Sequence, residues 1–222
     1  MPWASSISPP AKLFERRCAV QKVAKDQKGK DFEAARDCVR HTFEDWVIKS
    51  IEITFRATSE SEGDGKGGTP LAAFLLLSCG IDAISGFYAG RTSEHGTGAQ
   101  YKSFVRKYMP TYSPENMYEK LRCALAHNFA VDQGLALTHG QSHLHNVRDL
   151  TGETIVKNFE NVFFDFQAGI KRYFEDLDSS DDLKLRFMNR FRKFGLASPV
   201  EFKWQAAPTS AGLNFSGPSV TG

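Results

Sequence analysis

Residues 71–88, LAAFLLLSCGIDAISGFY, contain the longest apolar run of the chain and decide the fold. Thr69 and Pro70 come directly before them, and this pair is typical of an N-cap followed by the first residue of a helix. A helix that is hydrophobic on nearly all sides belongs at the centre of a bundle. Gly80 and Asp82 interrupt the run, which leaves it too short to span a bilayer. The stretch therefore predicts a central core helix, and no membrane partner is expected.

Amphipathic helices are predicted on both sides of this stretch. Residues 31–56 carry apolar side chains at intervals of three and four, as one buried helix face requires: Phe32, Ala35, Val39, Phe43, Trp46, Val47, Ile51 and Phe55. Further helices are predicted at residues 11–26, 99–109, 161–177 and 181–195, and in a segment that begins at Ser113 and Pro114.

A different pattern occupies residues 131–157. The stretches GLALTH (134–139) and ETIVKN (153–158) alternate as strands do, and LHNV (144–147) lies between them. They predict a β-hairpin insertion at about residues 134–157. The expected fold class is therefore mainly α: a helical bundle of five or six helices with a small β-hairpin insertion.

The expected domain organisation is one helical domain, residues 11–195, between two disordered ends. Residues 1–10 are rich in proline and serine, and residues 196–222 are rich in Ser, Ala, Gly and Pro. The N-terminus lacks a basic start followed by an apolar run, so no secretory signal is predicted. The four cysteines are far apart and fit reduced thiols. A cytoplasmic location is expected.

Charge and motifs exclude several classes of function. The formal net charge of +2 in 222 residues gives no global attraction to nucleic acid, so any polyanion site must be local. The sequence contains no P-loop, dinucleotide-binding glycine motif, nucleophile elbow or HExxH helix, which argues against an NTPase, a dehydrogenase, a common hydrolase and a zincin. No cofactor is predicted.

The stretch MYEKLRCALAHNFAV, residues 117–131, carries the strongest chemical signal. At about 100° per residue, Arg122 and His127 lie about 140° apart on a helix, with the small residues Cys123 and Ala126 between them. The helix dipole favours a protonated imidazole at the C-terminal end. An arginine suits a phosphoryl oxyanion, and a histidine suits acid–base chemistry. The core-facing stripe is predicted to be Met117, Tyr118, Leu121, Ala124, Leu125 and Phe129.

Asp82 is the one carboxylate in an otherwise apolar helix, so it requires a partner. Arg122 is the first candidate and Arg91 the second. An Asp82–Arg122 pair would orient the arginine for a substrate, and a purely structural pair that joins two helices is equally compatible with the sequence.

Two other stretches are candidates for binding. In YKSFVRKYMPTY (101–112), Lys102 and Arg106 alternate with aromatic residues, a mixture that can bind phosphates and stack bases. The alternative, which helical spacing favours, is that the aromatics are core and the cations solvated. His139, His143 and His145 form a weak zinc signal, because their spacing is undefined, and no metal site is predicted.

The RCALAH stretch resembles the Arg-x4-6-His motif of the HEPN (higher eukaryote and prokaryote nucleotide-binding) family. FLLLSCGIDAISGFY before it and FFDFQAGIKRYFEDL after it also resemble bacterial proteins of this type, and the resemblance covers about residues 31–195. It implies a small all-α domain, often a homodimer. Catalytic members usually have a polar residue after the arginine, where this chain has Cys123.

The function that this resemblance implies is a metal-independent endoribonuclease. His127 would be the acid or base, Arg122 would stabilise the phosphorane, and Asn128 would hold the phosphate or His127. The implied partners are RNA, a second protomer that shares the cleft, and a cognate antitoxin or regulatory protein of a defence or toxin–antitoxin system. The alternative is a non-catalytic module that binds a nucleotide or a protein through the same helix face.

Overall fold

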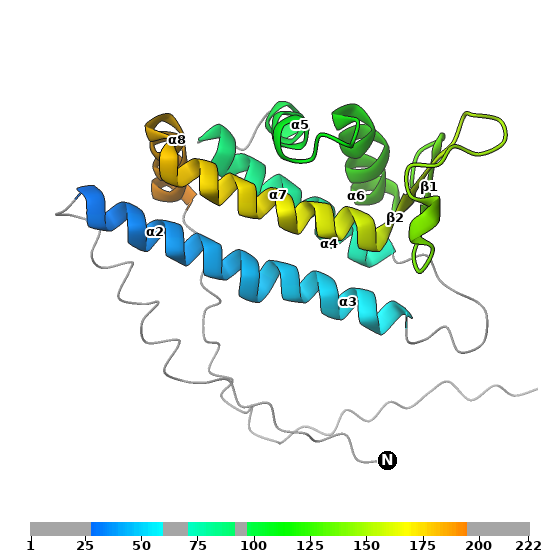
Figure 1. Ribbon diagram of the computed structural model, residues 1–222, viewed down its shortest axis with the longest axis horizontal. Helices are drawn as coiled ribbons and strands as arrows, with labels where there is room; N and C mark the ends of the chain where they lie inside the picture. The colour runs from blue at the N-terminus through cyan, green and yellow to red at the C-terminus, as the bar shows by residue number, and fades with distance from the viewer. Residues whose placement is uncertain (1–27, 60–70, 92–96, 195–222) are drawn as a thin grey trace, which may run out of the picture.

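Helix α4, Leu71–Ala89, lies at the centre of the structure, as its sequence predicted (Figure 1). The computed structural model describes residues 28–59, 71–91 and 97–194. Within these residues α4 contacts helices on every side of the bundle, and its apolar core residues Phe74, Leu77 and Ile81 are fully buried. At 19 residues it is long and apolar enough to cross a membrane, but just over half of it is buried by other helices, as is typical of a core helix. The prediction that this run is too short to span a bilayer was therefore wrong, because Gly80 and Asp82 do not interrupt the helix.

One long helix precedes α4, as predicted. It consists of α2 (Lys28–Thr42), a π-helical turn η1 (Phe43–Ile48) and α3 (Lys49–Ser59). Residues of the predicted stripe such as Val39 and Phe43 are buried, but Trp46 is 42% exposed. Its assignment to the core was wrong, because the wider turn of a π-helix changes the angular spacing on which the prediction depended.

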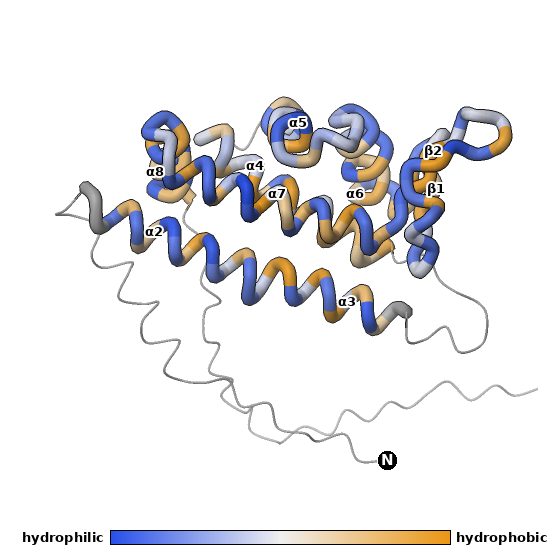
Figure 2. The backbone as a smooth tube through the Cα atoms, viewed as in Figure 1, coloured by the Kyte–Doolittle hydropathy of each residue, from blue (hydrophilic) through white to orange (hydrophobic). Residues whose placement is uncertain are grey.

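Helix α7, Phe159–Ser179, runs antiparallel beside this long helix (Figure 1). The rings of Phe55 and Phe159 stack at 4.3 Å at one end, and Arg36 pairs with Asp178 at 2.7 Å at the other. Asn158 caps α7 by accepting a hydrogen bond from the Asn161 backbone N–H. Figure 2 shows hydrophobic and hydrophilic residues alternating along α2, α3 and α7, as expected of helices with one face inward.

The other helices predicted within the described residues are also present. They are α5 (Thr97–Tyr108), α8 (Asp181–Phe194), and a helix composed of a π-helical part η3 (Asn116–Cys123) and α6 (Ala124–Asn128). Four aromatics in the YKSFVRKYMPTY stretch are buried: Tyr101, Phe104, Tyr108 and Tyr112. The interpretation of these aromatics as core residues is therefore confirmed.

Close packing between α4 and its neighbours depends on Gly80. A β-carbon at this position would lie 3.0 Å from the Phe166 ring of α7 and 3.1 Å from Val47. Glycine therefore lets the backbone of α4 approach both neighbours more closely than alanine would.

The two strands lie where the sequence predicted them, but the hairpin was wrong. β1 (Leu135–Thr138) and β2 (Ile155–Asn158) pair in parallel, with Leu135 opposite Ile155. The chain between them forms a short 3-10 turn, η4 (Ser142–Leu144), and then returns along the other side of β2. There the Asn146 N–H donates to the Val156 carbonyl and the Val156 N–H to the Val147 carbonyl. The segment LHNV therefore lies beside β2 on the side opposite β1. The predicted hairpin had placed β1 as the antiparallel neighbour of β2.

Several predictions concern residues outside the described ranges. These are the helix at residues 11–26, the Thr69–Pro70 cap, and the disordered ends at residues 1–10 and 196–222.

Candidate functional site

The helix that carries Arg122 and His127 is not a regular α-helix. Ser113 caps its start by accepting a hydrogen bond from the Asn116 N–H at 3.3 Å. After an α-helical start at residues 114–115, Asn116–Cys123 are π-helical, and the chain is α-helical again over Ala124–Asn128. π-Helical segments inside α-helices are frequent at functional sites.

Arg122 pairs with Asp82 of α4, which was the first predicted partner. Its Nε and Nη2 donate to the same oxygen, Oδ2, at 3.0 and 2.7 Å. The two side chains are 25% and 17% exposed. Partial burial lowers the pKa of Arg122, but the hydrogen bonds and charge of Asp82 outweigh burial and raise it. The contact between these two residues is confirmed, and it fixes the guanidinium against α4.

Hydrogen-bonding capacity remains on both partners. Oδ1 of Asp82 is buried and accepts no hydrogen bond from any described residue. Nη1 of Arg122 likewise donates to none of them. Tyr101 lies nearby, and burial, followed by the charge of Asp82, raises its pKa. The pair therefore holds Arg122 in place and leaves one edge of its guanidinium for another acceptor.

Tyr118 brings Lys102 close to this pair. The Arg122 guanidinium lies 5.8 Å from the centroid of the Tyr118 ring, and Lys102 Nζ lies 5.5 Å from it. Lys102 also pairs with the exposed Glu119 at 2.6 Å. A β-carbon on Gly98 would lie 2.7 Å from the Tyr118 ring, so α5 and the ring are in close contact. Lys102 and Arg122 thus share Tyr118 as a neighbour.

His127, Asn128 and Phe129 are exposed at the end of the helix. No described residue forms a hydrogen bond with the His127 ring. Phe129 was predicted to belong to the core stripe, and this was wrong, because it is 56% exposed. The physical reason is local: Phe129 ends the helix in the left-handed conformation, with φ 52°, so the helical period does not continue through it.

Two predicted binding residues lie elsewhere. Arg106 pairs with Glu115 at 3.5 Å, at the start of the η3 helix and not at its end. Arg91 follows α4, and its carbonyl accepts a hydrogen bond from Arg190 of α8 at 3.0 Å. Asp82 pairs with Arg122, the first of its two predicted partners.

A second polar cluster, which we call the closed network, was not predicted from the sequence as a unit. It consists of Tyr112, His145, Asn146, Lys157 and Asp165. The Tyr112 hydroxyl donates to Asp165 Oδ2 at 2.7 Å and also bonds His145 Nε2 at 3.0 Å. Nδ1 of His145 accepts the Asn158 N–H at 3.2 Å. Both ring nitrogens of His145 are therefore engaged within the fold.

Lys157 is the most unusual member of the closed network. It is 2% exposed, and among the described residues it forms no ion pair with a carboxylate. Its Nζ donates to Asn146 Oδ1 and lies 4.9 Å from the centroid of the Tyr112 ring. Burial lowers the pKa of Lys157 to about 8. A lysine at a buried position of the predicted strand was the one sequence signal that could have indicated this cluster.

The three histidines that gave the weak zinc signal lie in different environments. His139 packs edge-on against Phe55, His143 is exposed in η4, and His145 belongs to the closed network. In the part of the chain that the structure describes, no three side chains of the metal-binding types come together.

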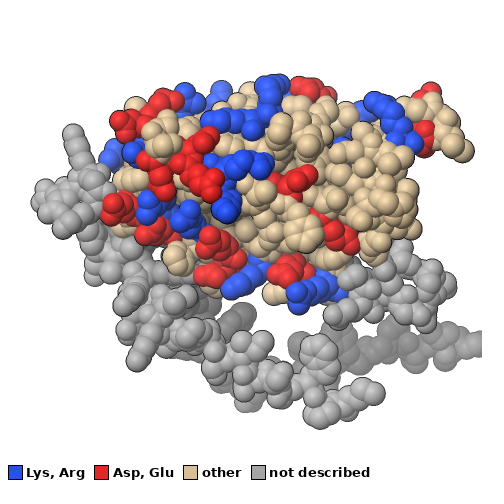
Figure 3. Space-filling model, viewed as in Figure 1, with Lys and Arg blue, Asp and Glu red and all other residues tan. Residues whose placement is uncertain are grey.

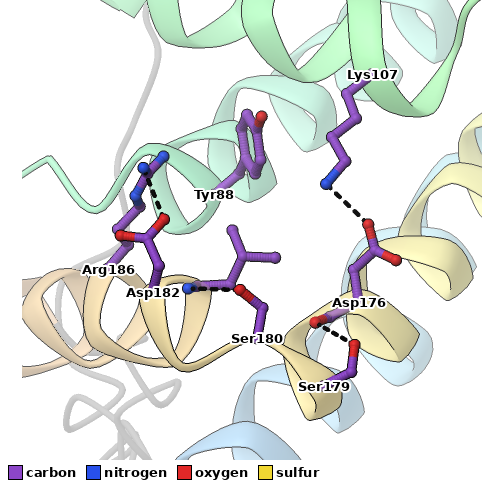
Figure 4. Close-up of a pocket in the computed structure, with 8 residues that line it drawn as sticks. Tyr88, Lys107, Asp176, Ser179, Ser180, Asp182 and Arg186 are labelled. Carbon is purple, nitrogen blue, oxygen red and sulfur yellow. Dashed lines mark hydrogen bonds and ion pairs between the residues drawn. The ribbon is translucent and has the colours of Figure 1, made fainter.

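A polar hollow of about 270 Å³ lies where α4, α5, α7 and α8 meet (Figure 4). Its two cations are both paired with carboxylates, Lys107 with Asp176 at 2.9 Å and Arg186 with Asp182 at 2.7 Å. It contains none of the predicted site residues and presents no uncompensated charge. The candidate site is therefore the end of the α6 helix with the Asp82–Arg122 pair.

Comparison with known proteins does not identify this site. No family model matches the chain, and neither a curated protein nor a solved structure is similar to it at a significant level.

Proposed function

We propose that this chain is a metal-independent endoribonuclease of the HEPN type, with His127 and Arg122 as its reacting pair. The observation that carries the proposal is the Asp82–Arg122 contact, because it fixes a guanidinium five residues before an exposed imidazole on the same helix. A fixed cation and a solvent-facing acid–base group are two of the elements that cleavage of a phosphodiester requires.

The proposed reaction is attack of a ribose 2′-OH on the adjacent phosphorus. One imidazole removes the proton of the 2′-OH while the P–O5′ bond breaks, and a second imidazole protonates the leaving 5′-oxygen. Arg122 stabilises the negative charge on the phosphorane through its remaining N–H groups. The products are a 2′,3′-cyclic phosphate and a 5′-OH.

The reaction needs two proton-transferring groups, and one end of the α6 helix supplies one histidine. A second protomer, with its own His127 facing the same phosphate, completes the proposed site. Asn128 is exposed next to His127, and in this proposal its amide hydrogen-bonds the phosphate. A regulatory protein or antitoxin that covers this cleft, and action in the cytoplasm, belong to the same proposal.

The charge distribution agrees with a local binding site. On the face seen in Figure 3, acidic and basic side chains are intermixed, most densely toward the end with α2 and α8. The formal net charge of +2 gives no global attraction to a polyanion, so RNA affinity would depend on the Arg122 neighbourhood itself.

The alternative function is a non-catalytic module that binds a nucleotide or a protein partner through the same residues. One observation favours it: Asp82 already forms an ion pair with Arg122 at 2.7 Å. A paired arginine binds an anion less strongly than an unpaired one.

The test is RNA cleavage in EDTA by the full chain and two matched variants. His127→Ala and His143→Ala each remove one exposed histidine, and only the first lies at the proposed site. We expect the wild type and His143→Ala to produce fragments with cyclic phosphate ends, and His127→Ala to be slower by about 10²- to 10⁴-fold. If wild-type protein leaves RNA as intact as His127→Ala does, the enzyme proposal is wrong. RNA binding by the inactive wild type would then support the alternative.

A further inference from the structure

Phe129 occupies a backbone conformation that is unusual for an aromatic residue. Among the described residues, positive φ occurs at four glycines, at Asn146 and at Phe129. Glycine is the usual residue at the end of a helix, because a β-carbon is crowded in the left-handed region. Phe129 has φ 52° there, and its N–H donates to the Leu125 carbonyl at 3.1 Å.

The same residue also exposes its ring. More than half of Phe129 faces solvent, although the sequence pattern of its helix would have buried it. A left-handed aromatic is strained, and an exposed ring loses the stabilisation that burial gives. Both effects disfavour phenylalanine for folding, and glycine would avoid both. Strain of this kind is typical of positions kept for function.

The neighbours of Phe129 define what the ring can bind. His127 and Asn128 come directly before it, and residues 126–130 are exposed as one continuous segment. A flat ring beside an imidazole and an amide offers one stacking surface next to polar groups. That combination is suited to a nucleobase attached to a phosphate, since every base has a π-face and protein aromatics stack on it.

We propose that Phe129 stacks on the face of an unpaired base next to the phosphate held at Arg122 and His127. This inference rests on the proposed function for its ligand. In a duplex the bases are already stacked on one another, so their faces are not available to Phe129. The left-handed turn ends the helix at Phe129, and its ring is 56% exposed there.

The test measures binding of a 12-nucleotide single-stranded RNA with one central 2-aminopurine, and of the same sequence as a duplex. All proteins carry His127→Ala, so that the RNA is not cut. Phe129→Leu removes the π-face and keeps an apolar side chain. Phe164→Leu is the matched control, because Phe164 is 65% exposed and lies in the regular helix α7.

We expect Phe129→Leu to weaken single-strand binding about tenfold or more and to abolish the quenching of 2-aminopurine. Phe164→Leu should leave both unchanged, and the duplex should bind more weakly than the single strand. Phe129→Gly should lose binding while its Tm stays equal or rises, because glycine relieves the strained φ. A residue kept only for folding would give a lower Tm instead.

The outcomes separate this inference from the proposed function. RNA cleavage by the wild type, with full binding by Phe129→Leu, would overturn the stacking inference alone. Quenching that depends on Phe129, without cleavage by the wild type, would support stacking and overturn the ribonuclease. If Phe129→Leu converts a dimer to monomers and leaves single-strand affinity unchanged, the ring serves a protein interface and the inference is wrong.

Discussion

Two regions of this protein contain a histidine beside other polar groups, and they differ in how completely those groups are bonded. At the end of α6, His127 is exposed and has no hydrogen bond to a described residue. In the closed network, His145 bonds Tyr112 through one nitrogen and the Asn158 N–H through the other. The first region has hydrogen-bonding capacity that a ligand can use, and in the second the fold already uses it.

The difference makes the end of α6 the better candidate for a functional site and the closed network the better candidate for a structural role. Burial, together with the positive charge of Lys157, lowers the pKa of His145, so its ring is neutral at physiological pH. A neutral imidazole with both nitrogens hydrogen-bonded holds the 145–147 segment, β2 and α7 together. It is not available for proton transfer to a substrate. A polar cluster is therefore a better candidate for a site when some of its members are exposed and lack partners.

The largest expected effect concerns Lys157 and tests whether the closed network is truly closed. The folded pKa of Lys157 is about 8, and its ordinary value is 10.5. Between these values the unfolded chain holds a proton that the folded chain has lost, so stability should rise with pH. The stability that neutral Lys157 contributes is fully present above pH 10.5, its ordinary pKa, and is lost as the pH falls through its folded pKa of about 8. The difference between the two pKa values corresponds to about 3 kcal/mol in the free energy of unfolding.

Urea unfolding of wild type and Lys157→Met from pH 7 to pH 10 measures this effect. The wild type should gain stability relative to the variant as the pH rises. Comparison with the variant cancels the titration of buried tyrosines, which is common to both proteins. The groups that face Lys157 are His145, the Asn146 side chain and the Tyr112 ring, with Asp165 beyond the tyrosine. Parallel pH profiles would show that water reaches the ammonium and that the network is open.

The next effect concerns Asp82 and tests how firmly the α6 end is attached to α4. Asp82→Ala leaves the partly buried Arg122 guanidinium without its partner, which should lower the free energy of unfolding by about 2 kcal/mol. Glu119→Ala is the matched control. It removes the exposed pair with Lys102, and we expect a loss of less than about 0.5 kcal/mol. Equal stability of the two variants would mean that the Asp82–Arg122 contact does not fix the arginine.

Much of the fold could be predicted, because it follows from residues that are near one another in the sequence. The apolar run at residues 71–88 predicted the central helix, and the spacing of Val39 and Phe43 predicted the long helix beside it. The errors arose where local backbone geometry departs from the ideal period. The π-turn exposed Trp46, and the left-handed conformation exposed Phe129. The parallel pairing of β1 with β2 depends on the path of the chain between them, which strand patterns do not encode.

The two polar clusters differ in the same way. The Asp82–Arg122 contact could be predicted because one carboxylate in an apolar helix requires a partner, and few cations were available. The closed network could not be predicted, because Tyr112, His145 and Asp165 come from three separate segments and each is ordinary in its own context. His145 was considered only as part of a weak metal signal. Residues that the fold brings together from separate segments have no characteristic spacing in the sequence by which they could be recognised.

The smallest effect compares the two histidines directly. His145→Ala removes the acceptor of the Asn158 N–H and one bond of the Tyr112 hydroxyl, both at partly buried positions. We expect it to lower the free energy of unfolding by about 1–2 kcal/mol, whereas His127→Ala should change it by less than about 0.5 kcal/mol. Chemical denaturation at pH 7 measures both. A large loss for His127→Ala would mean that this imidazole has a structural partner, and the open end of α6 would then resemble the closed network.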